Sequence, residues 1–145
     1  MAEQAPMKFV FYIAGPAEKV WDGFVSEAAN RAIFSTDFEI DLNAGGHVAW
    51  VGKGPDGKRV AFVHGEVLKA EPPKLLQYTF AIGPDGKFSR VTVELTQETE
   101  ATKMVVTHDQ WAEDDAMYAP TTDGWPRILS RLKTLIETGK TFKPH

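Results

Sequence analysis

The sequence contains no cysteine. Disulfide bonds, zinc sites built on thiolates and cysteine nucleophiles are therefore excluded, and this composition is typical of a protein from the reducing cytoplasm. Long apolar runs are also missing. The run near the N-terminus, residues 9–14, is shorter than the core of a signal peptide, and none approaches the ~20 residues of a membrane span. We therefore predict a soluble, cytoplasmic chain without a membrane span.

Several classes of site have no counterpart in the sequence. The net charge of −4 is spread along the chain, so we expect no nucleic-acid partner. His47, His64 and His145 show no metal-ligand spacing, and the acidic residues 113–115 lack the glycine and the spaced oxygens of a calcium loop. A glycine-rich phosphate loop and a G-x-S-x-G motif are absent. The sequence thus predicts no metal and no cofactor.

The length and composition that are present fit one domain over residues 1–145, because 145 residues with 43% hydrophobic side chains can bury one core. Residues 7–14 form a strand-like run that ends at Gly15 and Pro16. Two short amphipathic helices follow, the first around residues 20–25 and the second around residues 29–34.

Six further strand-like runs follow, separated by turn signals such as Gly-Pro-Asp-Gly and Pro-Pro. This rhythm predicts an antiparallel meander. The alternation within the last three runs predicts one apolar, inward-facing surface and one polar surface. The inward positions are Leu76, Tyr78, Phe80, Val91, Val93, Leu95, Met104, Val106 and His108.

The C-terminal part of the chain predicts a long helix over residues 122–139, because apolar residues recur there every three or four positions. Thr122 or Asp123 can cap its start, and Pro126 falls in the expected first turn, where a missing N–H costs little. Gly139 supplies the left-handed residue that ends the helix.

This helix is the only element long enough to cover the apolar face of the sheet. The predicted fold class is therefore α+β, with a curved antiparallel sheet of about seven strands around a long C-terminal helix and two short helices after the first strand. The basic residues of the helix, Arg127, Arg131 and Lys133, are expected between the buried positions on its solvated side. Residues 111–121 are predicted to form a loop that could act as a lid.

Four stretches resemble one known family: FSTDFEIDLNAGGHVAW (34–50), PDGKRVAFVHGEVLKAEPPKLLQYTF (55–80), TVELTQETEATKMVVTH (92–108) and DGWPRILSRLKTLIETG (123–139). They resemble the START-like (SRPBCC) superfamily, and within it the subfamily related to the C-terminal domain of the heat-shock-protein-90 ATPase activator. The resemblance implies a helix-grip fold with a cavity between the sheet and the last helix, which the superfamily uses for hydrophobic molecules. Gly-Trp-Pro resembles the usual start of that helix.

The expected cavity gives a set of candidate ligand-contacting residues. Aromatic walls with a few polar groups are typical of sites for apolar ligands, although the same residues can simply pack in a core. Trp125 also reads as an anchor for its helix. The candidates are Trp50, Tyr78, Phe80, Val93, Met104, Val106, His108, Trp111, Trp125 and Leu129.

His108 is the one candidate for chemistry, since it falls on the inward face near the end of a strand. Its imidazole could act as a general base or donate to a ligand carbonyl. The alternative is a core histidine whose nitrogens are hydrogen-bonded within the protein. One titratable group is thin support for catalysis, so no catalytic residue is assigned and His108 is kept as a weak candidate.

Three functions remain open. The first is a small protein that binds a hydrophobic or aromatic ligand without turnover, and the sequence favours it. The second is an enzyme of the cyclase or dehydratase type, with His108 as acid or base and Tyr78 orienting a carbonyl. The third is a protein-partner role, either chaperone-related or as a homodimer, through a sheet edge or through residues 111–121.

Overall fold

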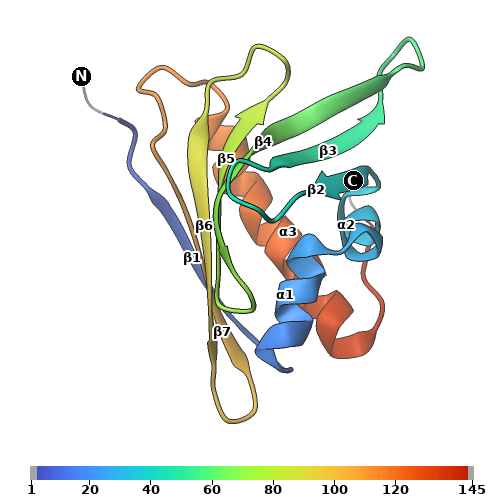
Figure 1. The fold of residues 1–145 in the computed structure, drawn as a ribbon, viewed down its shortest axis with the longest axis vertical. Coiled ribbons are helices and arrows are strands. Elements are labelled where there is room, and N and C mark those ends of the chain that lie inside the picture. The colour runs from blue at the N-terminus through green and yellow to red at the C-terminus, as the bar shows by residue number, and fades with distance from the viewer. Residues whose placement is uncertain (1–2, 144–145) are drawn as a thin grey trace.

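The structure is a computed structural model that describes residues 3–143. Its order of elements confirms the predicted α+β class, with a strand, two short helices, six strands and a long helix (Figure 1). The elements are β1 (Met7–Ile13), α1 (Ala17–Val25), α2 (Glu27–Phe34), β2 (Asp37–Ile40), β3 (His47–Lys53), β4 (Arg59–Glu71), β5 (Leu75–Ile82), β6 (Ser89–Gln97), β7 (Thr102–Asp109) and α3 (Tyr118–Thr138).

The strands form one antiparallel sheet in the order β1-β7-β6-β5-β4-β3-β2. Every strand from β2 to β7 pairs with its sequence neighbour, as expected for a meander, and β1 closes onto β7. Figure 1 shows the sheet curving around α3, with α1 and α2 beside the helix. This is the helix-grip arrangement that the sequence predicted.

The predicted inward face of β5, β6 and β7 is confirmed. Phe80 is half-buried and the other eight predicted side chains are buried, with His108, Met104 and Val106 fully inaccessible. They pack against the stripe of α3 that contains Trp125, Leu129, Leu132 and Ile136. Burial of this apolar surface is what holds the helix in the sheet.

The predicted start of the last helix is wrong. The helix α3 begins at Tyr118, four residues before the expected start, so Pro126 lies inside it and Thr122 is not a cap. The hydroxyl of Thr122 instead donates to the carbonyl of Tyr118, 3.0 Å away. Tertiary contacts hold the added turn, since the Tyr118 ring packs on Trp111 and its hydroxyl donates to the carbonyl of Ala5 at 2.7 Å. The end at Gly139 is confirmed, with φ at 83°.

Arg131 is also not where the pattern placed it. Its side chain is 7% exposed, whereas Arg127 is exposed as expected. The Nε of Arg131 donates to the carbonyl of Ile33 at 3.0 Å, at the end of α2, and the ring of Phe142 lies 5.8 Å from its guanidinium carbon. A carbonyl left free at a helix end is the partner that the periodicity alone could not show. Among residues 3–143, no helix is both long and apolar enough to cross a membrane.

Candidate functional site

A cavity of about 250 Å³ lies between α3 and the strands β3, β4 and β5. One wall comes from α3 and the opposite wall from the sheet, while the α2–β2 junction closes one side. Phe62 is 42% exposed, which places its ring at the mouth. The lining residues are Phe34, Thr36, Trp50, Phe62, Val63, Tyr78, Phe80, Ile82, Thr121, Gly124, Trp125 and Ile128.

A second, smaller space of about 30 Å³ lies next to this cavity and deeper in the core, against α1 and β2. Phe34, Trp50, Tyr78, Trp125 and Ile128 line both spaces. These shared side chains lie between the two spaces and form the inner wall of the cavity. The rings of Phe34, Trp50 and Tyr78 are in contact, since the centroid of Trp50 lies 5.8 Å from that of Phe34 and 6.0 Å from that of Tyr78.

Trp50, in this inner wall, is held in place by a hydrogen bond to the buried side chain of Asn30. The indole N–H of Trp50 donates to Oδ1 of Asn30 at 3.0 Å. The amide of Asn30 in turn donates to the carbonyls of Phe24 and Ser26 at 3.0 and 2.9 Å, where α1 passes into α2. Asn30 is 3% exposed, so this buried network sets the orientation of Trp50 relative to both helices.

The polar groups of the cavity are hydroxyls. Of the described residues that line it, none is charged, and Thr36, Tyr78 and Thr121 carry the only side-chain oxygens. Burial raises the pKa of the Tyr78 phenol far above its usual range, so this group stays neutral. Oγ1 of Thr36 is buried and has no hydrogen-bond partner among the described residues. For the hydroxyl of Tyr78, burial is the cause of the pKa shift and no hydrogen bond from a described residue contributes to it.

His108 lies beside the cavity, in the packed core, with both ring nitrogens engaged. The indole N–H of Trp125 donates to Nδ1 at 2.9 Å, so Nδ1 is the acceptor and the proton of the neutral ring is on Nε2. Nε2 then donates to Oγ of Ser89 at 2.7 Å, and that hydroxyl donates to the carbonyl of Phe80 at 3.2 Å. Both ring nitrogens of His108 and the hydroxyl of Ser89 therefore have hydrogen-bond partners within the protein.

The surroundings of His108 favour its neutral form. The ring is inaccessible to solvent and packs against Trp111 and Phe80, with centroids 4.3 and 4.7 Å away. Burial lowers the pKa of His108 to about 3, although nearby Asp109 acts in the opposite direction. A second ring proton would also face the donor N–H of Trp125. This histidine therefore has no free nitrogen for acid–base chemistry in the folded protein.

The candidate residues divide into two groups in the structure. Trp50, Tyr78, Phe80 and Trp125 line the cavity. The others lie in the packed core, except that Trp111 borders a separate space of about 10 Å³. The core group is Val93, Met104, Val106, His108 and Leu129.

The sequence reasoning missed several lining residues. Phe62, Thr36 and Gly124 belong to the cavity, and none was a candidate. For Gly124 a signal was available, since a glycine inside a helical pattern costs stability and is kept where space is needed. A Cβ added to Gly124 would meet no atom within 4 Å, so this position leaves the cavity open.

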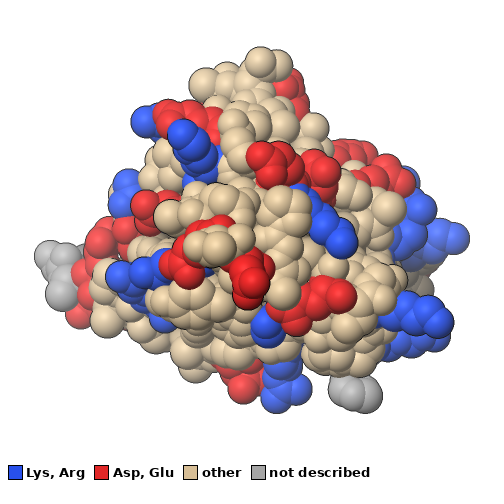
Figure 2. Space-filling model, turned by 90° about the horizontal axis from the view of Figure 1, so that it is seen from below, with Lys and Arg blue, Asp and Glu red and all other residues tan. Residues whose placement is uncertain are grey.

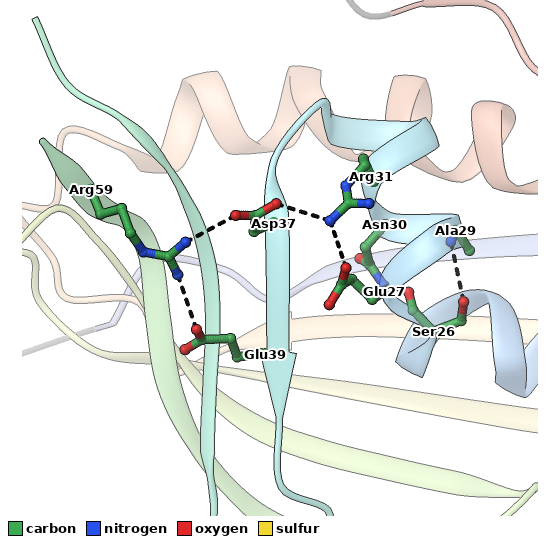
Figure 3. A network of polar contacts seen from close by, with 8 residues as sticks. All are labelled: Ser26, Glu27, Ala29, Asn30, Arg31, Asp37, Glu39 and Arg59. Carbon is green, nitrogen blue, oxygen red and sulfur yellow. Dashed lines mark hydrogen bonds and ion pairs between the residues drawn. The ribbon is translucent and has the colours of Figure 1, made fainter. Parts of the chain in front are cut away.

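The charged groups lie elsewhere. Figure 3 shows Asp37 of β2 between Arg31 of α2 and Arg59 of β4, with Oδ–N distances of 3.1 and 3.0 Å. The hydrogen bond from Arg31 lowers the pKa of Asp37 below its usual value. These pairs are solvent-exposed and contribute little to stability. On the face seen in Figure 2, acidic and basic side chains are interspersed.

The candidate metal-binding groups are also apart from the cavity. Nε2 of His64 lies 2.9 Å from the carbonyl of Gly83, and Asp114 forms an ion pair with Lys87. His145 lies outside the described residues. In the part of the chain that the structure describes, no three metal-ligating side chains come together.

The comparison with protein families settles the relationship that the fold suggests. The model for activator of Hsp90 ATPase homolog 1-like proteins matches residues 14–137. The chain belongs to this family. The match extends from the end of β1 to the last turn of α3, so it includes every element that lines the cavity.

Solved structures of the same fold include DynU16, CalU16 and an Aha1 dimer. DynU16, from the dynemicin biosynthetic locus, is 21% identical with a TM-score of 0.74, over 94% of this chain and 48% of DynU16. CalU16 from Micromonospora echinospora is 22% identical with a TM-score of 0.72, over 92% of this chain and 77% of CalU16. The Aha1 dimer from Colwellia psychrerythraea is 18% identical with a TM-score of 0.75, over 94% of this chain and 99% of that protein.

At these identities the likeness shows the fold alone. This chain spans about half the length of DynU16. None of the curated protein sequences matches it significantly.

Proposed function

We propose that this protein binds a small aromatic or hydrophobic molecule in the cavity between α3 and strands β3–β5. The observation that carries the proposal is the cavity of about 250 Å³ with aromatic walls, which is far larger than the space of about 30 Å³ in the adjoining core. Protein interiors are normally close-packed, and an apolar concave space with a few polar groups is the usual form of a small-molecule site.

The groups around the cavity favour binding without turnover. A catalytic acid or base needs a nitrogen or oxygen that can exchange a proton near neutral pH. The Tyr78 phenol stays neutral, and both nitrogens of His108 are hydrogen-bonded within the core. The cyclase or dehydratase alternative therefore loses the residue on which it depended.

The test uses substitutions at Gly124, the residue of α3 that lines the cavity without a side chain. Because Gly124 lines the cavity and a Cβ there would meet open space, we expect a leucine at this position to extend into the cavity, and an alanine adds one methyl group as a matched control. Both variants should keep the fold, because either residue is a better helix former than glycine. We expect the alanine variant to be about 0.5–1 kcal/mol more stable than the parent protein.

Binding is measured by titrating the neutral fluorophore N-phenyl-1-naphthylamine and following both its emission and the quenching of tryptophan emission, to which Trp50 and Trp125 of the cavity contribute. The parent protein and Gly124→Ala should bind the fluorophore, and the affinity of Gly124→Leu should be lower by at least roughly tenfold. Equal affinity of all three proteins would place binding elsewhere. No binding to the parent protein, together with no co-purifying compound in native mass spectrometry, would contradict the proposal.

A protein-partner role is the second candidate, and the family match favours it. The strand β1 is at the edge of the sheet and exposes Val10 and Tyr12, which are 44% and 51% accessible. Edge strands can pair with another chain, including a second copy. Stimulation of the ATPase of a purified Hsp90, or a dimer mass by light scattering that Tyr12→Lys reduces to a monomer, would support this role. A monomer without effect on Hsp90 would exclude it.

A further inference from the structure

We infer that the cavity selects neutral aromatic molecules that carry a hydrogen-bonding oxygen, and that it rejects carboxylates. This inference rests on the proposed function and narrows the class of ligand. It comes from three observations: the rings of the walls, the absence of charge among the described lining residues, and the hydroxyl groups of Thr36, which has no partner, and Tyr78.

The walls favour a ring over a flexible chain. Side chains from three directions present aromatic surfaces: Phe34 from α2, Trp50 and Phe80 from the sheet, and Trp125 from α3. Aromatic pairs gain from stacked and edge-to-face contacts in addition to the burial of area. Both indoles are held by hydrogen bonds to Asn30 and His108, so these walls are in place before a ligand arrives.

The charge pattern excludes anions. A buried carboxylate needs a cation or several donors, and the described lining residues contain no Lys, Arg or His. Arg31 and Arg59 line a separate surface depression that also borders Thr36, and there Asp37 pairs with both (Figure 3). An acid in the cavity would therefore lose its hydration without gaining an ion pair.

The hydroxyls supply the polar contact. The phenol of Tyr78 is held neutral by burial, so it can donate to a carbonyl or accept from a ligand hydroxyl. Oγ1 of Thr36 is buried without a partner on another wall of the same cavity. Buried polar groups are normally hydrogen-bonded, and a ligand oxygen is the partner that would complete this site.

The experiment compares three naphthalene probes of similar size: 2-acetylnaphthalene, 2-ethylnaphthalene and 2-naphthoate. Their affinities are measured at pH 7.5 by quenching of tryptophan emission, for the parent protein, Tyr78→Phe and Thr36→Val. We expect the ketone to bind the parent about five- to tenfold more tightly than the hydrocarbon, because one hydrogen bond is gained. The carboxylate should bind at least about 100-fold more weakly than the ketone.

In Tyr78→Phe the preference for the ketone should fall to about twofold or less, while the affinity for the hydrocarbon stays unchanged. That unchanged affinity shows that the variant is folded and the cavity intact. Thr36→Val, which keeps the shape of the side chain, reports the contribution of the second hydroxyl in the same way.

The outcomes separate the inference from the function on which it rests. If ketone and hydrocarbon bind the parent equally, or if the carboxylate binds as tightly as the ketone, the inferred selectivity is wrong and the cavity remains a binding site. If none of the three probes binds the folded parent protein, both fail. A ketone preference that persists in both hydroxyl variants would also overturn the assignment of the polar contact.

Discussion

The space between the sheet and α3 has two halves, which differ in empty volume and in the hydrogen bonding of their buried polar groups. Over β6 and β7, the side chains of Val93, Met104 and Val106 are buried and both nitrogens of His108 have partners, whereas the adjacent indole nitrogen of Trp111 has none among the described residues. Over β3–β5 there is a cavity, and the hydroxyls of Thr36 and Tyr78 have no partner in the described chain.

The two halves share Trp125. Its indole N–H belongs to the packed half, where it donates to His108, and its ring forms a wall of the cavity. Both halves are lined by aromatic and aliphatic residues, so hydrophobicity does not distinguish them. What distinguishes them is the empty volume and the hydrogen bonding of their hydroxyl groups, since the hydroxyl of Ser89 has partners and Oγ1 of Thr36 has none among the described residues.

The largest difference between the halves is expected in a pair of neighbours on α3. Leu129 is fully buried in the packed half, and Ile128 is half-buried at the cavity. Leu129→Ala should lower the free energy of unfolding by about 3 kcal/mol, because it leaves a new void. Ile128→Ala should cost clearly less, since its side chain already borders empty space. Urea denaturation of both variants is the measurement, and equal losses would show that the halves are packed alike.

The pH dependence of stability should come from the packed half. His108 has a pKa of about 3 in the folded protein against 6.5 when exposed. Between these values the unfolded chain binds one more proton, so stability is complete above pH 6.5 and falls as the pH decreases. The slope is about 1.4 kcal/mol for each pH unit, which gives about 2 kcal/mol between pH 6.5 and 5.

His108→Gln is the control for this slope, because its amide can accept from Trp125 and donate to Ser89 without titrating. The difference between the two proteins in urea midpoint should shrink as the pH is lowered from 7.5 to 5. Parallel profiles would mean that His108 is not the group responsible.

A pair of hydroxyl deletions compares satisfied and unsatisfied groups directly. Ser89→Ala removes the acceptor for Nε2 of His108 and should cost about 1 to 2 kcal/mol. Tyr78→Phe removes a hydroxyl that has no partner in residues 3–143, so stability without ligand should change by less than about 0.5 kcal/mol. Thermal and urea unfolding of the two variants give the comparison. A large loss for Tyr78→Phe would reveal a bond to this hydroxyl in the free protein.

The smallest effect is expected outside both halves, at the exposed ion pairs of Asp37. Asp37→Asn should shift the unfolding midpoint little, and the shift should vanish in 1 M salt because exposed pairs are screened. Unfolding of both proteins at low and high salt measures this. A shift that survives high salt would indicate that Asp37 holds the α2–β2 junction by more than charge.

Periodicity predicted the packed half well and the cavity poorly. The inward positions of β6 and β7 follow strict alternation, and their burial needs only that one face of a sheet be covered. The cavity depends on which side chains stop short of one another across β3, β4 and α3, a property of three-dimensional spacing. Phe62 shows this, since its position in β4 carries no sign that its ring stands at a mouth.

The errors on α3 have the same origin. We predicted that the helix starts at residue 122, where Thr122 or Asp123 could cap it. Contacts of Tyr118 with Trp111 and Ala5 instead hold one more turn at its start. We predicted that Arg131 is exposed because it is charged, but its side chain is buried and donates a hydrogen bond to the free carbonyl of Ile33. His108 was correctly seen as inward, while its role depended on Ser89 and Trp125, which are distant in sequence.

The hydrogen bonds that fix α3 have a consequence for how a molecule could enter. The helix is tied to the sheet by Trp125 and His108, to α2 by Arg131 and Ile33, and to β1 by Lys133, whose Nζ donates to the carbonyl of Tyr12 at 2.7 Å. A slide or tilt of the helix would strain all three of these hydrogen bonds. For the proposed ligand, these bonds favour entry past Phe62, the lining residue that is exposed, over entry by a movement of the helix.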